Sequence, residues 1–302
     1  MTRLPDFIII GAMKSATTTL HGLLASQPGV FMSTPKEPCF FSDDGVWARG
    51  LGWYASLFEG APAGALLGES STHYTKLPTY PETVERARSV VPGAKLIYVM
   101  RHPVDRLVSH YIHEWSQGNT TGTIEEEIAR DGMFVDYSRY AMQIGPWLDA
   151  YGAGRVLPVF FDRLRADPAG ELRRVAGFLG LPGPVRTPEG DRRENVSSDR
   201  LRKGPLLRFI METPGVSHAR RLLVPRRARE WVKDRFFRMK RRPELRDETR
   251  RELEKIFDED LGALSGLLGL DRPLSCVTFH EVAASMDDPR FVSRAGVGSG
   301  GA

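Results

Sequence analysis

Short apolar runs alternate with amphipathic stretches along much of the chain. Runs of strand length lie near residues 7–11, 65–69, 96–101 and 155–161, and an unbroken apolar run of this length is typical of a strand buried on both faces. Stretches with helical periodicity lie near residues 17–26, 81–90, 104–116, 137–150 and 168–179. Because strands alternate with helices, we predict an α/β fold whose mainly parallel sheet is flanked by helices.

The first apolar run is followed by a turn with unusual chemistry. Gly11 ends the run, and hydroxyl residues follow Lys14 as far as Thr19 before the apolar pattern resumes. The first N–H groups of a helix lack helical partners and carry partial positive charge, so this turn can bind an anion. Lys14 adds a point charge, and we expect a phosphate or sulfate ester as ligand. The alternative is an ordinary turn with a helix N-cap at Ser15 or Thr17.

The spacing in this turn differs from that of the Walker A loop. That motif has a glycine, four further residues and then Gly-Lys-Ser/Thr, whereas only two residues separate Gly11 from Lys14 and no glycine precedes the lysine. The shorter turn leaves less room for a triphosphate. A small-molecule kinase or another nucleotide-dependent phosphotransferase is therefore the less favoured alternative.

A second segment offers anion-binding groups at the end of another predicted strand. Arg101 follows the apolar run, and Ser109 lies eight residues later on the predicted helix. Pro103 suits the first turn of that helix, and Asp105 complements its dipole. The guanidinium group and the hydroxyl group can both reach one phosphate. An arginine in this position can also simply pair with a surface carboxylate.

Together these two segments resemble those of the sulfotransferases that use 3′-phosphoadenosine 5′-phosphosulfate (PAPS). The turn is similar to their 5′-phosphosulfate loop, K-x-x-T-T/S, and Arg101 with Ser109 is similar to their 3′-phosphate motif. Other segments resemble the heparan-sulfate-type branch with its soluble bacterial members: residues 36–41, 50–54, 68–74, 139–140, 156–161, 167–168 and 178–181. The resemblance extends from about residue 5 to about residue 275.

The resemblance implies a P-loop-kinase-like sulfotransferase fold and in-line transfer of a sulfuryl group from PAPS to a hydroxyl group, with PAP as the product. It implies that Lys14 is catalytic and that Arg101 and Ser109 bind the 3′-phosphate. The implied 5′-side residues are Lys14, Ser15, Ala16, Thr17, Thr18 and Thr19. No metal is implied, because cationic side chains would neutralise the developing charge.

The acceptor side of the implied site depends on a glutamate. In the heparan-sulfate-type branch a Glu before two Phe residues acts as base, which implies that role for Glu37. Its apolar neighbours lead us to expect partial desolvation and a raised pKa; the alternative is a surface pair of Lys36 and Glu37. His73 is a rival base, and Glu69 could orient Lys14 or the acceptor. Glu69, His73 and Tyr140 are the further candidates on this side.

Departures from the branch concern the acceptor. Ser70 stands where the branch commonly has Lys, and Cys39 stands where some members have His. We therefore leave the acceptor open among a small molecule, a glycolipid and a saccharide. A non-catalytic PAP-binding protein is disfavoured because both Lys14 and Glu37 are present. The residues that close over the 3′ side are also open, between residues 192–195 and residues 202–204.

Composition fits a globular enzyme. The chain has 302 residues, of which 41% are hydrophobic and 26% charged, so it can bury a full core. Its net charge of only +4 does not indicate nucleic-acid binding. We predict one domain over residues 1–286 and a disordered tail over 287–302. From about residue 199 the chain is helical and rich in Arg, which indicates a solvated face or a rim for an anionic acceptor or lipid head groups.

Cysteine usage and hydropathy bear on the compartment. Cys39 and Cys276 are the two cysteines, and we expect them to be free thiols in a reducing environment. We find neither a run of transmembrane length nor a signal peptide, so we expect a cytoplasmic protein for which only peripheral membrane contact is open. The oligomeric state is not indicated.

Overall fold

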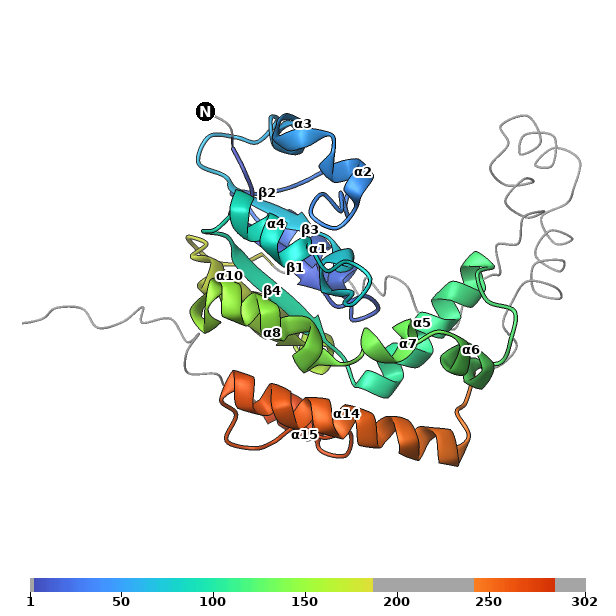
Figure 1. Cartoon of the computed structure of the whole chain (residues 1–302). Helices are drawn as coiled ribbons and strands as arrows, with labels where there is room; N and C mark the ends of the chain where they lie inside the picture. Colours follow the sequence, from blue (N-terminus) through green and yellow to red (C-terminus); the bar gives the residue numbers. More distant parts are fainter. Residues whose placement is uncertain (1–2, 187–241, 286–302) are drawn as a thin grey trace, which may run out of the picture.

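A five-stranded parallel sheet forms the middle layer of the computed structural model, which describes residues 3–186 and 242–285 (Figure 1). Its strands are β1 (Phe7–Gly11), β2 (Val30–Met32), β3 (Leu66–Ser70), β4 (Lys95–Met100) and β5 (Val156–Phe160). Their order across the sheet is β2-β3-β1-β4-β5. Four strands confirm the predicted ones. β2 was not predicted, because three residues are too few for an apolar run to be recognised.

Helices cover both faces of the sheet. On one face the core includes side chains from α1 (Thr17–Ala25), α9 (Phe161–Ala166) and α10 (Pro168–Leu179). On the other it includes side chains from α4 (Thr83–Val90), α5 (Pro103–Gln117), α8 (Tyr140–Tyr151), α14 (Asp247–Leu268) and α15 (Phe279–Ser285). The shorter helices are α2 (Asp44–Trp47), α3 (Gly50–Ser56), α6 (Ile124–Arg130), α7 (Met133–Asp136), η1 (Thr72–Thr75) and η2 (Ala153–Arg155).

The described helices confirm the predicted α/β class and a helical C-terminal part. The basic stretch before residue 242, the candidates at residues 192–195 and 202–204, and the predicted tail lie outside the described residues. The single-domain organisation stays a prediction.

The central strand shows why an unbroken apolar run is needed here. Ile8 and Ile10 of β1 enter the core on the α8 side, whereas Phe7 and Ile9 enter the core on the α1 side. All four are fully buried. Successive side chains of a strand point to opposite faces, so a strand covered on both faces must be apolar at every position.

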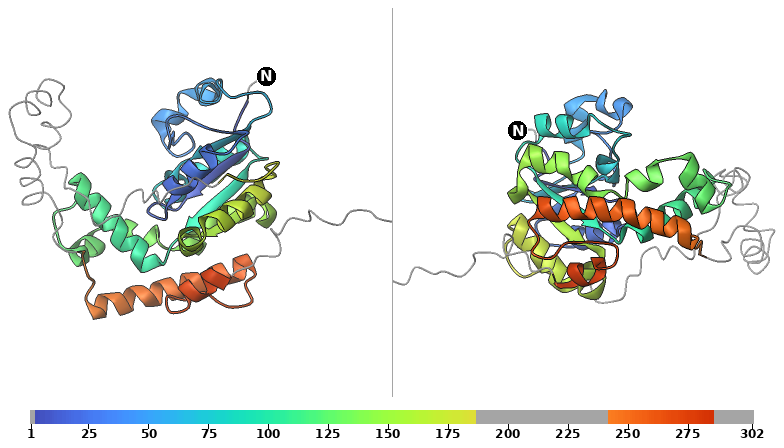
Figure 2. Two further views of the ribbon diagram at one scale, coloured as in Figure 1. Left: turned by 180° about the vertical axis from the view of Figure 1, so that it is seen from behind. Right: turned by 60° about the horizontal axis from the view of Figure 1, so that its bottom comes forward.

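The C-terminal helix α14 is joined to α8 by a buried carboxylate as well as by apolar packing. Asp260 accepts hydrogen bonds from the backbone N–H groups of Ala141 (2.8 Å) and Met142 (3.1 Å). These are unpaired donors in the first turn of α8, so Asp260 caps α8 from another helix. Figures 1 and 2 show α14 on the face of the sheet that α8 also covers.

The parallel arrangement brings the segments that follow β1, β3 and β4 to one edge of the sheet. β1 lies between β3 and β4, with Ile9 paired to Ser70 and Gly11 paired to Tyr98. In open parallel sheets, ligands bind outside the carboxyl ends of the strands. The predicted anion-binding segments both begin at this edge, so the fold places them side by side.

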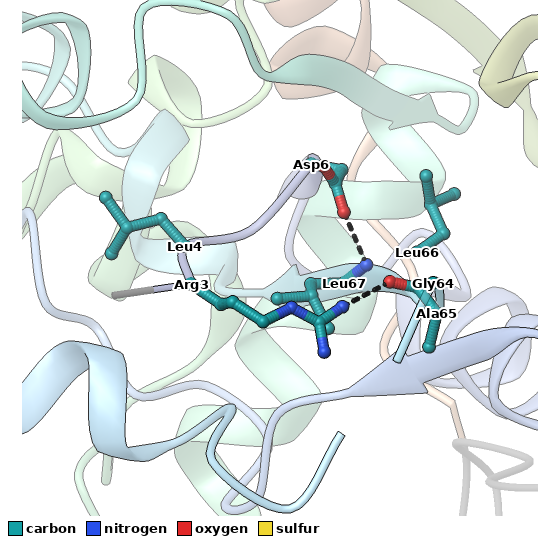
Figure 3. A pocket seen from close by; sticks show the side chains of 7 residues that line it. All are labelled: Arg3, Leu4, Asp6, Gly64, Ala65, Leu66 and Leu67. Carbon is teal, nitrogen blue, oxygen red and sulfur yellow. Dashed lines mark hydrogen bonds between the residues drawn. The ribbon is translucent and has the colours of Figure 1, made fainter. Parts of the chain in front are cut away.

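A shallow pocket lies at the opposite edge, where β1 and β3 begin (Figure 3). Its charged side chains are already engaged by backbone groups: Arg3 donates to the carbonyl of Ala65 (2.6 Å), and Asp6 accepts from the N–H of Leu67 (2.7 Å). These bonds tie the N-terminal segment to β3. The pocket therefore has a structural explanation and no evident chemistry.

Candidate active site

The turn between β1 and α1 presents helix N–H groups that no side chain caps. The N-cap residue of α1 is Ala16, in the left-handed region with φ of 68°, and it makes no side-chain cap bond. The first turn contains no acidic residue. The alternative of a side-chain N-cap at Ser15 or Thr17 is therefore wrong. The turn keeps the donors and the positive potential that an anion requires.

Backbone geometry in this turn is unusual at a second non-glycine position. Lys14 has φ of 70°, and such left-handed conformations persist where the surrounding structure enforces them. At Gly11, an added Cβ would lie 1.9 Å from the hydroxyl oxygen of Thr75, which itself donates to the carbonyl of Ile10 (3.0 Å). The close approach of η1 to the end of β1 thus requires glycine.

The hydroxyl residues of the turn differ in access. Thr18 is exposed and Thr19 is half-buried, whereas Ser15 and Thr17 are buried. Lys14 is half-buried beside them. The structure thus brings the six predicted 5′-side residues together, with Thr18 the most accessible to a ligand.

The segment after β4 begins α5 as the sequence predicts. His102 is the N-cap, Pro103 is in the first turn, and Asp105 is the acidic residue there. The side chain of Arg101 is 15% exposed and lies 3.9 Å from the carboxylate of Asp105. Its guanidinium lies 4.9 Å from the centre of the Phe161 ring.

Arg101 retains an unused donor. Its Nε atom is buried and has no hydrogen-bond partner among the described residues. Burial lowers the pKa of Arg101, although arginine remains protonated in proteins. A buried guanidinium donor without an acceptor is costly, and an anion would satisfy it. Ser109 is buried two turns further along α5, and its pairing with Arg101 on one phosphate stays a prediction.

Tyr140 lies beneath Arg101 and not on an accessible surface. It is fully buried, its hydroxyl donates to the carbonyl of Arg101 (2.5 Å), and the Arg101 N–H donates back to it (3.2 Å). Burial raises the pKa of Tyr140 to about 12, so the phenol is neutral. The structure therefore places this acceptor-side candidate where it holds the backbone of Arg101.

Glu37 is tied to the carboxyl end of β3. Its N–H donates to the carbonyl of Ser70 (2.9 Å), and the hydroxyl of Thr72 donates to its Oε2 (3.0 Å). The ammonium of Lys36 bonds to its Oε1 at 2.6 Å. Since β3 is the neighbour of β1, the carboxylate lies at the same edge as the anion-binding turn. The pair with Lys36, which was the alternative to a catalytic role, is present, and the role of Glu37 as base stays a prediction.

The expected rise in the pKa of Glu37 is wrong. Burial does disfavour the carboxylate, but the Lys36 ammonium, its hydrogen bond and the hydrogen bond from Thr72 outweigh burial and lower the pKa. Glu37 is therefore ionised throughout the neutral range. A low pKa weakens the tendency of a carboxylate to take a proton, so a catalytic role for Glu37 would depend more on its position.

His73 lies close to Glu37, with its ring stacked on that of Tyr80 at 5.1 Å between centroids. Burial, and next the charge of Lys76, lower the pKa of His73 to about 4. The imidazole is therefore neutral at pH 7. Both candidate bases are thus in their proton-accepting forms at neutral pH, on the same side of the site.

Glu69 is fully buried at the end of β3. It accepts hydrogen bonds from the hydroxyl groups of Tyr54 and Ser71, the latter at 2.6 Å. Burial raises its pKa. Through Ser71, Glu69 is joined to the loop that carries Glu37, and its role towards Lys14 or the acceptor stays a prediction.

Sequence reasoning missed two titratable residues near Glu37. His21 lies on α1, and burial, followed by the charge of Lys36, lowers its pKa. It lies four residues after Thr17, which places both on one helix face, a signal that could have found it. Lys76 is half-buried after η1, and burial lowers its pKa although Glu37 opposes this. No motif or residue spacing in the sequence indicated Lys76 as a candidate site residue.

Some predictions concern absences. Among residues 3–186 and 242–285, no group of three or more His, Cys, Asp or Glu side chains could hold a metal ion. No helix in that same part of the chain is long and apolar enough to cross a bilayer. Both cysteines are free thiols, as expected. The cytoplasmic location and the absence of a metal stay predictions.

The turn after β1 and the segment that begins with Arg101 after β4 carry the two motifs on which the resemblance rests. A comparison with family models tests that resemblance. A model of the sulfotransferase domain matches residues 4–265. The chain belongs to the sulfotransferase domain family. The match extends over all five strands of the described sheet.

Individual relatives are similar to parts of this sulfotransferase. Heparan sulfate glucosamine 3-O-sulfotransferase 3B1 of Mus musculus is 37% identical over 191 residues, covering 59% of this chain and 47% of its own. Heparan sulfate glucosamine 3-O-sulfotransferase 6 of Homo sapiens is 33% identical over 187 residues, covering 59% and 53%. The chain thus spans about half the length of these curated relatives.

A solved structure shares the fold. The sulfotransferase from Alicyclobacillus acidocaldarius matches with a TM-score of 0.64 and 23% identity, over 89% of this chain and 98% of its own. This agreement confirms the predicted sulfotransferase fold.

Proposed function

We propose that this sulfotransferase transfers the sulfuryl group of PAPS to a hydroxyl group of a saccharide, with Glu37 as general base. One observation carries the proposal: the Glu37 backbone is bonded to the end of β3 and its carboxylate to Thr72, at the sheet edge where the adjacent strand β1 leads into the uncapped N-terminus of α1. The saccharide, among the acceptors that the sequence left open, is supported by relatives whose names specify heparan sulfate glucosamine.

The donor would be held by groups at the ends of β1 and β4. The N–H groups of the turn and the Thr18 hydroxyl suit the 5′-phosphate, and the unsatisfied Nε of Arg101 suits the 3′-phosphate together with Ser109. When bound, PAPS supplies a sulfuryl group on a phosphate leaving group. Lys14 is placed to stabilise the charge that develops on that phosphate as it leaves.

The acceptor proton would pass to Glu37. As the acceptor oxygen bonds to sulfur, the bond from sulfur to the bridging phosphate oxygen breaks, and the hydroxyl proton moves to the carboxylate. Thr72 and Lys36 hold the two carboxylate oxygens and thereby fix the orientation of Glu37. The protein's contribution is positioning and charge stabilisation, as in phosphoryl transfer.

A transfer assay with radiolabelled PAPS tests the proposal. Heparan-type oligosaccharides and simple alcohols are offered in parallel, and the labelled product is located by mass spectrometry. We expect PAPS-dependent labelling of a saccharide oxygen. Labelling confined to the simple alcohols would overturn the acceptor class, and absence of labelling with every acceptor would overturn the activity.

A binding comparison separates the proposal from the kinase alternative. PAP at a hundred times its dissociation constant should stabilise the folded protein by about 2.7 kcal/mol, which thermal unfolding detects. ATP with Mg²⁺ should stabilise it much less, because the turn lacks Walker A spacing. The reverse order would favour a phosphotransferase.

A further inference from the structure

A buried acid and a hydroxyl group lie directly behind the loop that carries Glu37. Glu69 is fully buried, and the Ser71 hydroxyl donates to it at 2.6 Å. Ser71 is also fully buried, and its oxygen accepts the N–H of Cys39 at 3.1 Å. A continuous chain of hydrogen bonds therefore runs from Glu69 through Ser71 to the backbone two residues after Glu37.

Glu69 determines what Ser71 can do. A serine hydroxyl has one proton and two lone pairs. Because the Ser71 hydroxyl donates its one hydrogen bond to the carboxylate of Glu69, its lone pairs are left to accept the N–H of Cys39. The other oxygen of Glu69 accepts the Tyr54 hydroxyl, on the side of the carboxylate away from Ser71. The acid thus sets the orientation of the hydroxyl, and the hydroxyl anchors the loop.

The anchored loop needs such support. Glu37 has φ of 61° and Cys39 has φ of 55°, so two non-glycine residues within three positions adopt the left-handed conformation. Such a conformation is strained for a non-glycine residue and persists only where the surroundings enforce it. The anchors on the two strained residues are the bonds from the Glu37 N–H to Ser70 and from the Cys39 N–H to Ser71.

We propose that Ser71, oriented by Glu69, is a positioning residue that sets the place of the Glu37 carboxylate. This inference rests on the proposed function, in which Glu37 is the base. Without the Ser71 anchor, the loop relaxes towards unstrained backbone angles, and Glu37 moves away from Thr72. The donor side is unaffected, because no described bond joins Ser71 to the residues assigned to PAPS.

Ser71→Ala tests the anchor by separating turnover from donor binding. We expect kcat to fall by about 10²-fold, the loss typical of a misplaced catalytic group, while the dissociation constant for PAP stays within twofold. Glu69→Gln preserves shape and weakens the orientation of Ser71, so its loss of kcat should be smaller. Ser71→Thr retains the hydroxyl group and should recover most of the turnover.

Tyr54→Phe is the matched control. It removes the hydrogen bond to the other oxygen of Glu69 but leaves the bonds that join Glu69, Ser71 and Cys39. The structural perturbation is comparable in depth, since Tyr54 is also fully buried. We expect it to lower the free energy of unfolding in urea while kcat stays within about threefold. An equal loss of kcat in Tyr54→Phe and Ser71→Ala would mean that general packing, and not the anchor, is responsible.

A titration that does not depend on turnover completes the test. NMR of ¹³C-labelled glutamate carboxyl groups, assigned with Glu37→Gln, reports the pKa of Glu37 directly. Ser71→Ala should raise that pKa because the Thr72 hydrogen bond is lost, and Tyr54→Phe should leave it unchanged. An unchanged pKa and kcat in Ser71→Ala would overturn the inference. A shifted pKa in a protein that transfers no sulfuryl group would instead refute the proposed function alone.

Discussion

On the donor side of the site, each binding group lies in the segment that directly continues from its own strand. Lys14 lies in the turn after β1, and Arg101 and Ser109 lie in the segment that follows β4. On the acceptor side, Glu37 is held by Thr72, which is 35 residues away in the chain, and Cys39 is held by Ser71, which is 32 residues away. One side is a pair of local strand–turn–helix units, and the other is a loop attached to a distant strand.

This difference has consequences for how each side tolerates change. A strand–turn–helix unit carries its geometry in its own backbone, so removing one side chain leaves the rest of the cradle in place. The acceptor loop contains strained residues and depends on bonds to β3. We therefore expect substitutions on the donor side to act on binding and charge, and substitutions on the acceptor side to act also through position.

The largest effect is expected at Glu37. Glu37→Gln keeps the shape and removes the base, so kcat should fall by about 10²–10⁴-fold while the affinity for PAP is retained. The acidic limb of the pH–rate profile should disappear, because the limb reports the carboxylate. His73→Asn is the control and should keep the limb; an inactive His73→Asn beside an active Glu37→Gln would assign the base to His73.

The next largest effect is expected at Lys14. Lys14→Ala should cost about 3 kcal/mol in the barrier, the usual loss for one electrostatic contact to the transition state, with unfolding in urea nearly unchanged. Lys14→Arg keeps the charge and should retain more of the turnover. Steady-state kinetics with saturating PAPS measures both. Near-normal turnover in Lys14→Ala would remove the residue from the mechanism.

Recognition of the 3′-phosphate should follow. Arg101→Ala should weaken PAP binding by roughly 1.5–3 kcal/mol, the value of a hydrogen bond to a charged group. Ser109→Ala should weaken PAP binding by less. Calorimetry with PAP and with the analogue that lacks the 3′-phosphate makes the comparison. Equal weakening of both ligands would show that these residues contact another part of the donor.

Asp260 offers a test of one long-range support of the donor side. Asp260→Ala removes the cap on α8, whose Tyr140 holds the backbone of Arg101, and should lower the free energy of unfolding by about 0.5–2 kcal/mol. Urea denaturation measures the loss. If the free energy of PAP binding weakens by more than this loss in the free energy of unfolding, the donor side depends on tertiary bonds as strongly as the acceptor side does. The contrast between the two sides then fails.

The smallest effect is a shift of the pH–rate profile. Burial raises the pKa of Glu37, and the Lys36 charge and hydrogen bonds lower it to a greater extent. In Lys36→Ala the lowering is reduced, so the pKa should rise and the acidic limb of kcat should move to higher pH. A limb that stays in place would show that Thr72 and the other neighbours hold the low pKa without Lys36.

The sequence by itself determined four strands, the main helices and the donor side. These features are local: an apolar run of strand length, a turn with Lys14 and hydroxyl residues, and Arg101 eight residues before Ser109 all lie within single segments. The parallel order then places the segments at one edge, because the carboxyl ends of parallel strands coincide. The match of the family model to residues 4–265 bears out the predicted family, and the roles of the donor-side residues stay predictions.

Only the tertiary structure decided the acceptor side. Whether the pKa of Glu37 is raised or lowered depends on the balance between its burial and its bonds to Lys36 and Thr72. The sequence alone led us to expect a raised pKa, whereas the structure gives a lowered one. The places of Glu69 and Tyr140 likewise depend on bonds to Ser71 and to the backbone of Arg101. Such contacts join segments that are distant in the chain, and neither periodicity nor spacing encodes them. Local pattern specifies which groups a segment carries, whereas burial and hydrogen bonds between segments specify their orientation and charge.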